Sequence, residues 1–238
     1  MAKKTKMKFV TNAEAEKTLH KNLKFTALEQ YKLLRTNLQF TLPEDVDCPI
    51  IGVTSSVRGE GKSTTAINLA YAIAESGKKV LLIDADLRIP SIAQKMEMDG
   101  TVGLTDMLLA NNSEIKVYQT KLMDNWCVLP AGCLPPNPSE LLGSHRMQRL
   151  LNKLADGFDY IVLDLPPVNV VSDALAISSY LTGMIIVVRE GYSEKKELAN
   201  CIRQIKLSNV KVLGTVINET QIDKKHYSKY KNYYKSRG

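Results

Sequence analysis

The 238-residue chain lacks any apolar run of the roughly eighteen residues that a membrane-spanning helix requires. Its first residues, 1–8, are basic, but no apolar segment follows them, so a secretory signal peptide is not expected. Apolar residues still make up 44% of the chain, which suffices for a sizeable core. We therefore expect a globular, cytoplasmic protein.

Cysteine, histidine and tryptophan are also scarce. The four cysteines are scattered and form no metal-type pair, which favours a reduced, cytosolic protein. The three histidines suggest no metal site, and the single Trp126 is expected in the core. A disulfide scaffold or a cysteine–histidine metal site is therefore not expected.

The net charge of +7 is concentrated at the two ends of the chain. Residues 1–10 carry +4 and residues 221–238 carry +5, which leaves −2 for residues 11–220. The basic pI therefore does not describe a basic globular surface. Nucleic acid and an anionic membrane surface are candidate partners of such ends, and plain solvated tails are the alternative.

Residues 56–63, Ser-Val-Arg-Gly-Glu-Gly-Lys-Ser, have the pattern of a phosphate-binding loop, with a serine at the first position, where glycine is usual. An apolar run precedes the loop and a helical pattern follows it, as the motif requires. Lys62 can reach the β- and γ-phosphates of a nucleotide, and the Ser63 hydroxyl can ligate Mg²⁺. Asn218, which ends the last predicted strand, is a candidate adenine contact or an ordinary turn residue. The predicted nucleotide-binding residues are Gly59, Glu60, Gly61, Lys62, Ser63, Thr64 and Asn218.

Apolar runs without polar alternation repeat along the chain and are separated by helical patterns. This order predicts an α/β P-loop fold, a mostly parallel sheet with helices on both faces. The predicted strands are 50–55, 79–84, 126–130, 159–164, 184–188 and 210–217, and the predicted helices lie near 27–41, 62–76, 139–155, 172–181 and 193–207. We expect a basic segment at 1–26, one domain at 27–220 and a flexible tail at 221–238.

Three aspartates lie at or just after the ends of predicted strands. Asp84 ends the strand at 79–84 and Asp86 comes two residues later, and Asp164 ends the strand at 159–164 and precedes two prolines. The carboxyl ends of parallel strands meet at one edge of the sheet, where the ligand binds in this class of fold. Mg²⁺ keeps several waters there and needs few carboxylates. Solvated or helix-capping acids are the alternative.

These residues together resemble the deviant-Walker branch of P-loop proteins, which includes the Min/Par partitioning ATPases and the bacterial tyrosine kinases. Val57 stands where the partitioning ATPases have a signature lysine, which argues against them. The runs at 81–88 and 135–142 are similar to segments of the tyrosine kinases, in the free-standing form that serves capsule and exopolysaccharide export. Arg58 stands where that family often has proline.

The resemblance implies an ATP- and Mg²⁺-dependent protein-tyrosine kinase with its kinase domain at 27–220. It implies that Lys62 holds the transferring phosphate, with Mg²⁺ organised by Ser63, Asp86 and Asp164. Asp84 is our candidate to take the tyrosine proton, and the reverse assignment of Asp84 and Asp86 stays open.

The chain's last twelve residues contain four tyrosines among basic residues. The resemblance favours a cluster of autophosphorylation sites over nucleic-acid binding or a passive tail, and no nucleic acid is expected as a partner. Each phosphotyrosine adds about −1.5 to −2 charge, so two would nearly neutralise the tail. The expected sites are Tyr227, Tyr230, Tyr233 and Tyr234.

Glu29, Lys32 and Arg35 are similar to the family's Glu-x-x-Arg-x-x-Arg oligomerisation motif, with lysine in place of the first arginine. Lysine keeps the charge without the bidentate fork. A solvated stripe with a local ion pair is the alternative reading. The resemblance implies a homo-oligomeric ring, protein substrates with tyrosines, and a membrane-embedded activator on a separate chain that recruits the protein to the inner face of the membrane.

Two other function classes remain at this stage. One is an ATP-driven switch that binds membrane or nucleic acid without phosphorylating protein. The other is an interaction module whose nucleotide sets only its oligomeric state. The tyrosine cluster and Val57 argue against the switch.

Overall fold

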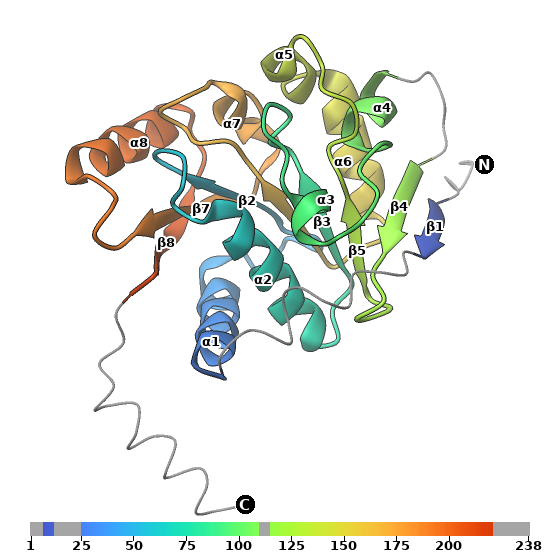
Figure 1. Cartoon of the computed structure of the whole chain (residues 1–238), viewed down its shortest axis with the longest axis horizontal. Coiled ribbons are helices and arrows are strands. Elements are labelled where there is room, and N and C mark those ends of the chain that lie inside the picture. The colour runs from blue at the N-terminus through green and yellow to red at the C-terminus, as the bar shows by residue number, and fades with distance from the viewer. Residues whose placement is uncertain (1–6, 12–24, 110–114, 221–238) are drawn as a thin grey trace, which may run out of the picture.

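A computed structural model describes residues 7–11, 25–109 and 115–220 of the protein. An eight-stranded sheet in the order β1-β4-β5-β3-β6-β2-β7-β8 runs through its centre (Figure 1). The β4–β5 pair is antiparallel and the other neighbouring pairs are parallel. The strands are β1 Met7–Thr11, β2 Ile50–Ser55, β3 Val80–Asp84, β4 Ile115–Gln119, β5 Trp126–Leu129, β6 Tyr160–Asp164, β7 Gly183–Arg189 and β8 Val212–Asn218.

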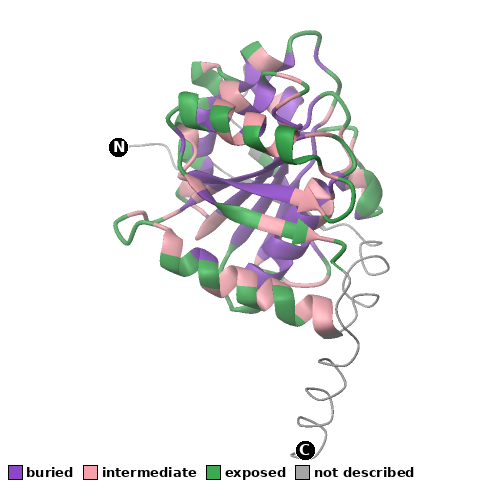
Figure 2. Cartoon of the chain, turned by 90° about the vertical axis from the view of Figure 1, so that its left-hand side faces the viewer, coloured by how far each residue is buried: buried purple, intermediate pink, exposed green. Residues whose placement is uncertain are grey.

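Helices cover both faces of the sheet, so each face has its own apolar core. One core is closed by α1 (Phe25–Thr41), α2 (Lys62–Glu75) and the short α3 (Ile92–Lys95). The other is closed by α4 (Leu104–Leu109), α5 (Pro138–Leu142), α6 (His145–Ala155), α7 (Asp173–Ala176) and α8 (Lys195–Leu207), and a 3₁₀ helix spans Ser178–Tyr180. Figure 2 shows the buried strands between the two helical layers.

The strand sequences explain this three-layer arrangement. Successive side chains of a strand point to opposite faces, and in β3 Leu81 and Ile83 enter one core while Val80 and Leu82 enter the other. Burying an apolar side chain on either face stabilises the fold by about 25 cal/mol per Å² removed from water. Strands that are apolar throughout therefore need helices on both sides.

The predicted α/β P-loop fold is confirmed, and each of the six predicted strands is present. Trp126 is fully buried and packs edge-to-face on Tyr71, with ring centroids 5.8 Å apart. The sequence reading missed β1 and β4, whose sequences, MKFVT and IKVYQ, mix apolar and polar residues. These two strands pair with each other at one end of the sheet.

Two of the predicted helices differ from the structure. The segment predicted as one helix over 139–155 is divided into α5 and α6. The division falls at Gly143–Ser144, because the Ser144 hydroxyl accepts a hydrogen bond from the Met147 amide at 3.2 Å and so caps a new helix. The segment 172–181 is likewise α7 followed by the 3₁₀ helix. Across the part of the chain that the structure describes, no helix is long and apolar enough to span a bilayer.

Candidate active site

The phosphate-binding loop connects the end of β2, at Ser55, to the start of α2, at Lys62. Strands β3, β6 and β2 are adjacent in the sheet, so their carboxyl ends bring the loop and the predicted acids together. Asp84 and Asp164 occupy paired positions on β3 and β6. The convergence expected for this edge of the sheet is therefore present.

Two glycines give the loop its shape. Gly59 and Gly61 have φ values of +81° and +95°, in the left-handed region that side chains disfavour. A Cβ on Gly61 would collide with the Asn218 side chain, and one on Gly59 would lie 3.3 Å from the Tyr192 hydroxyl. The loop therefore requires glycine at both positions, for its backbone and for its neighbours.

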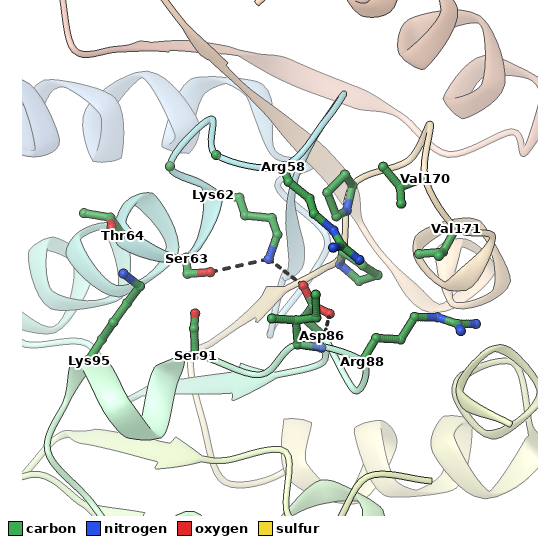
Figure 3. Close-up of a pocket in the computed structure, with 15 residues that line it drawn as sticks. Arg58, Lys62, Ser63, Thr64, Asp86, Arg88, Ser91, Lys95, Val170 and Val171 are labelled. Carbon is green, nitrogen blue, oxygen red and sulfur yellow. Dashed lines mark hydrogen bonds and ion pairs between the residues drawn. The ribbon is translucent and has the colours of Figure 1, made fainter. Parts of the chain in front are cut away.

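Lys62 lies at the centre of the site, as Figure 3 shows. Its Nζ is 2.8 Å from Asp86 Oδ2, 3.5 Å from Asp164 Oδ1 and 3.4 Å from the Ser63 Oγ. Burial alone would lower the pKa of Lys62, but the Asp164 and Asp86 carboxylates outweigh burial and raise that pKa. The ammonium therefore stays charged in a nearly buried position.

The two carboxyl groups at the strand ends, Asp84 and Asp164, are fully buried. Asp84 Oδ2 accepts hydrogen bonds from the Ser91 and Ile92 amides at 3.0 and 2.9 Å. Burial, and then the charge of Asp164, raise the pKa of Asp84 to about 7. Burial also raises the pKa of Asp164, against the opposing effect of Lys62. A positive charge close to Asp84 and Asp164 therefore favours their ionised forms.

This donor set fits a Mg²⁺ ion that is held partly by substrate. Asp164 Oδ2 is buried and has no hydrogen-bond partner within the part of the chain that the structure describes. In those same ranges, no three His, Cys, Asp or Glu side chains form a group that could hold a metal ion unaided. Mg²⁺ commonly binds through one or two carboxylates, waters and nucleotide phosphates. Ser63, Asp164 and the neighbouring acids suit such a site.

A pocket of about 340 Å³ opens beside the loop. Asp86 lines this pocket, whereas Asp84 does not, and the Asp84 oxygens accept hydrogen bonds from backbone amides. The loop residues Gly59, Gly61, Lys62, Ser63 and Thr64 also line it. Five of the seven predicted nucleotide-binding residues therefore share one cavity.

The other two predicted nucleotide-binding residues, Glu60 and Asn218, support the loop. The buried Glu60 carboxylate accepts hydrogen bonds from the Ser56 hydroxyl at 3.0 Å, from the Val57 amide at 2.8 Å and from the Ser193 hydroxyl. Asn218 Nδ2 donates to the Glu60 carbonyl at 3.1 Å. Ser56 thus has a structural use at the position where glycine is usual. An adenine contact for Asn218 stays a prediction.

Sequence reasoning missed the partner of Arg88. The Arg88 guanidinium donates to both oxygens of buried Asp173, with Nε–Oδ2 and Nη2–Oδ1 distances of 2.8 and 3.0 Å. The Ser139 hydroxyl also donates to Asp173. This cluster joins the segment after β3 to α5 and α7. A buried aspartate in α7 could not be foreseen, because nothing in the sequence shows that its position is buried.

The predicted oligomerisation residues lie on α1. Lys32 Nζ is 3.0 Å from Glu29 Oε1 and 3.9 Å from Glu75 Oε2, on α2. Arg35 Nη1 donates to the Ala72 carbonyl at 2.7 Å. Within a single chain these residues therefore fasten α1 to α2, and their role between chains stays a prediction. The predicted phosphorylation sites, Tyr227, Tyr230, Tyr233 and Tyr234, lie outside the described residues.

Known proteins share this fold and these motifs. A family model described as an AAA domain matches residues 48–215. Tyrosine-protein kinase YwqD of Bacillus subtilis is 38% identical over 205 residues, which cover 86% of this chain and 85% of that protein. The solved chimerical protein CapA2B2 superposes with a TM-score of 0.76 at 29% identity, covering 90% of this chain and 93% of that one.

The kinase domain of the Escherichia coli tyrosine kinase ETK superposes with a TM-score of 0.75 at 31% identity, covering 83% of this chain and 78% of that one. YwqD and the ETK kinase domain are each more than 30% identical to this chain over most of both chains. They agree with the phosphate-binding loop and the strand-end acids in indicating one family. The chain belongs to the bacterial tyrosine-protein kinases, P-loop enzymes that phosphorylate tyrosine.

Proposed function

We propose that this kinase uses Mg·ATP to phosphorylate tyrosines of its own C-terminal tail, one subunit acting on the tail of another. The observation that carries the proposal is the nearly buried Lys62 ammonium, held between Asp86 and Asp164 on the wall of a pocket. A lysine in this position can leave the carboxylates for the γ-phosphate when a nucleotide enters.

The chemistry requires mainly alignment and charge stabilisation. In phosphoryl transfer the transition state is loose, and negative charge spreads over the transferring oxygens. The loop amides at the start of α2 and the Lys62 ammonium face that charge. Mg²⁺, when bound through Ser63 and the strand-end acids, neutralises charge on the phosphates. Burial disfavours the ionised forms of Asp84 and Asp164, and a cation bound beside them would offset that cost.

The contacts favour Asp86 as the group that takes the tyrosine proton, the reverse of our expectation for Asp84. Asp86 lines the pocket, and a base must first be within reach of the proton. Both acids accept hydrogen bonds from backbone amides, but Asp84 does not line the pocket, so we assign it a supporting role beside the metal. As the bond from the γ-phosphorus to the phenol oxygen forms, the bond to the ADP oxygen breaks and the phenol proton passes to Asp86.

The wider role follows from the family. We propose that the kinase regulates the synthesis or export of capsular or extracellular polysaccharide, as a homo-oligomeric ring. A membrane-embedded activator on another chain would bring it to the inner face of the membrane from the cytoplasm. Repeated phosphorylation would turn the basic tail acidic, so that it is repelled by the site's carboxylates and the ring loosens.

Labelled ATP tests the proposal. The purified full chain is incubated with Mg²⁺ and γ-labelled ATP, and mass spectrometry locates the phosphate. We expect label on Tyr227, Tyr230, Tyr233 or Tyr234, and loss of most label when the chain is truncated after Asp223. Truncation should leave nucleotide binding unchanged, because the residues that line the pocket all lie upstream.

Two outcomes would contradict the proposal. Release of phosphate to water with none on protein would identify an ATP-driven switch. Label confined to tyrosines of the folded domain, such as Tyr71 or Tyr160, would retain the kinase and exclude the tail as its substrate. A mixture of full-length, site-defective chains and truncated, active chains shows whether one subunit labels another.

A further inference from the structure

The tip of the phosphate-binding loop carries a second cation. Arg58 lines the same pocket as Lys62 and Asp86. In Figure 3 its side chain extends from the loop into the pocket, whereas the side chain of Arg88 points away toward the far wall. Both arginines line the cavity, but only the Arg58 side chain is directed into it.

The charged partners of the pocket explain that difference. The Arg88 guanidinium is committed to both oxygens of Asp173. The Lys62 ammonium is shared between Asp86 and Asp164. Within residues 7–11, 25–109 and 115–220, the Arg58 guanidinium has no hydrogen bond or ion pair, and only its backbone carbonyl is engaged. A guanidinium facing a phosphate pocket without a partner is available for an anionic ligand.

The backbone that carries Arg58 is fixed from the outer side. The Tyr192 hydroxyl donates to the Arg58 carbonyl at 3.1 Å, and Arg189 Nη1 donates to the Gly59 carbonyl at 3.3 Å. The Arg189 guanidinium also lies 5.2 Å from the centroid of the Tyr192 ring. These two contacts come from Arg189, which ends β7, and from Tyr192, which follows it. They hold the carbonyls of two successive loop residues, Arg58 and Gly59. The Arg58 side chain therefore starts from a braced point, which reduces the entropy lost when it binds a ligand.

We propose that Arg58 is a catalytic residue that contacts the γ-phosphoryl group of ATP during its transfer, with Tyr192 as its positioning residue. The inference rests on the proposed phosphotransfer function. Arg58 undergoes no covalent change. Its N–H groups donate to oxygens of the phosphoryl group while the bond to ADP breaks and the bond to the tyrosine oxygen forms. An arginine so placed acts where negative charge shifts, and so accelerates transfer more than it strengthens binding.

Variants at position 58 test this role. At saturating Mg·ATP we expect Arg58→Ala to lower the single-turnover rate of self-labelling about 10²-fold, with MgADP affinity by calorimetry within about 3-fold of wild type. Arg58→Lys keeps the charge without the planar fork and should recover part of the rate. Arg149→Ala, on the exposed face of α6, is the matched control and should label at the wild-type rate.

Tyr192→Phe separates positioning from contact. The change removes the hydrogen bond to the Arg58 carbonyl and keeps the ring. In a chain that retains Arg58, the rate of self-labelling should therefore fall only a few-fold. In an Arg58→Ala background the same change should have no further effect, because the side chain that Tyr192 positions is gone. Thermal unfolding of each variant checks that it folds as the wild type does.

The outcomes separate this inference from the proposed function. A wild-type chain that transfers no label to tyrosine overturns the proposed function and, with it, the role of Arg58. If the wild-type chain labels its tail and the Arg58→Ala chain labels its tail equally fast, only the role of Arg58 is overturned. Parallel losses of MgADP affinity and rate in a folded Arg58→Ala chain would also overturn it, since they indicate ground-state binding.

Discussion

Two groups of charged residues in this molecule invite comparison, the active site and the stripe on α1. In the site, the Lys62 side chain is 13% exposed and its partners Asp86 and Asp164 are 6% and 0% exposed. On α1, the Lys32 and Glu29 side chains are 34% and 46% exposed. In each group the lysine Nζ lies close to one acid, 2.8 Å from Asp86 Oδ2 in the site and 3.0 Å from Glu29 Oε1 on α1, yet the surroundings of the two pairs differ.

Burial decides what each group can do. Exposed ion pairs are screened by water and contribute roughly 0–1 kcal/mol to stability. Charges without full solvation shift their pKa values and respond strongly to an added ion. The buried group therefore suits chemistry on a phosphate, whereas the exposed one stabilises the single chain weakly and remains open to a neighbouring subunit.

Removal of the central ammonium should have the largest effect. Lys62→Met is expected to reduce self-labelling at least about 10³-fold, because it removes the ammonium that is shared between Asp86 and Asp164. Circular dichroism should show an intact fold. Lys153→Met, on the exposed face of α6, is the control and should label normally. Wild-type labelling by Lys62→Met would mean that the site lies elsewhere.

The next test separates Asp84, which ends β3, from Asp86, which comes two residues later. Asp86→Asn is expected to slow transfer about 10²-fold or more while MgADP affinity changes little, because the pocket-facing base is lost. Asp84→Asn should mainly weaken Mg·nucleotide binding, measured by calorimetry with and without Mg²⁺. If Asp84→Asn instead slows transfer at unchanged affinity, the original assignment of Asp84 as the base is restored.

The exposed stripe should respond in a different assay. Replacing Glu29, Lys32 and Arg35 together by alanine is expected to shift sedimentation toward smaller species and to slow tail labelling about 10-fold if the stripe joins subunits. Thermal unfolding should change modestly, since each exposed contact contributes about 1 kcal/mol or less.

A triple alanine variant on α6 at exposed His145, Arg149 and Lys153 is the control for removing three polar side chains from a helix surface. It should sediment and label as the wild type does. If the wild type is oligomeric and the α1 variant sediments in the same way, the stripe has no role between subunits. It then only fastens α1 to α2, through contacts such as that of Arg35 with the Ala72 carbonyl.

The smallest effect concerns the ligand-free protein and pH. The pKa of Asp84 in the fold is about 7, above its ordinary value of 3.8. A raised folded pKa stabilises the fold at low pH, and this contribution is lost as pH rises through about 7. The free energy of unfolding should therefore fall between about pH 4 and pH 7 and level off above that, by at most about 1.4 kcal/mol per pH unit for this one group.

Urea unfolding at four pH values checks this slope. Asp84→Asn should flatten it, whereas Asp45→Asn, at an exposed position after α1, should leave it unchanged. An equal slope in wild type and Asp84→Asn would show that other groups control the pH dependence.

Much of the fold could be predicted because its central strands are apolar on both faces. Such runs have few alternatives to a sheet with helices on both sides. The phosphate-binding loop, Lys62 and the acids therefore lie at the carboxyl edge of that sheet. The less apolar β1 and β4 were missed because short mixed sequences carry a weak periodic signal. The break between α5 and α6 depended on a single serine cap.

The P-loop, the strand-end acids and the central strands could be read from the sequence, since they depend on local patterns and on residue types with specific chemistry. The partners at the pocket became visible only in the folded chain: Asp86 faces the pocket, Asp173 binds Arg88, and the Arg58 guanidinium has no partner among the described residues. Those outcomes depend on side chains brought together from distant segments. Burial and partner choice are properties of that packing, and no local pattern encodes them.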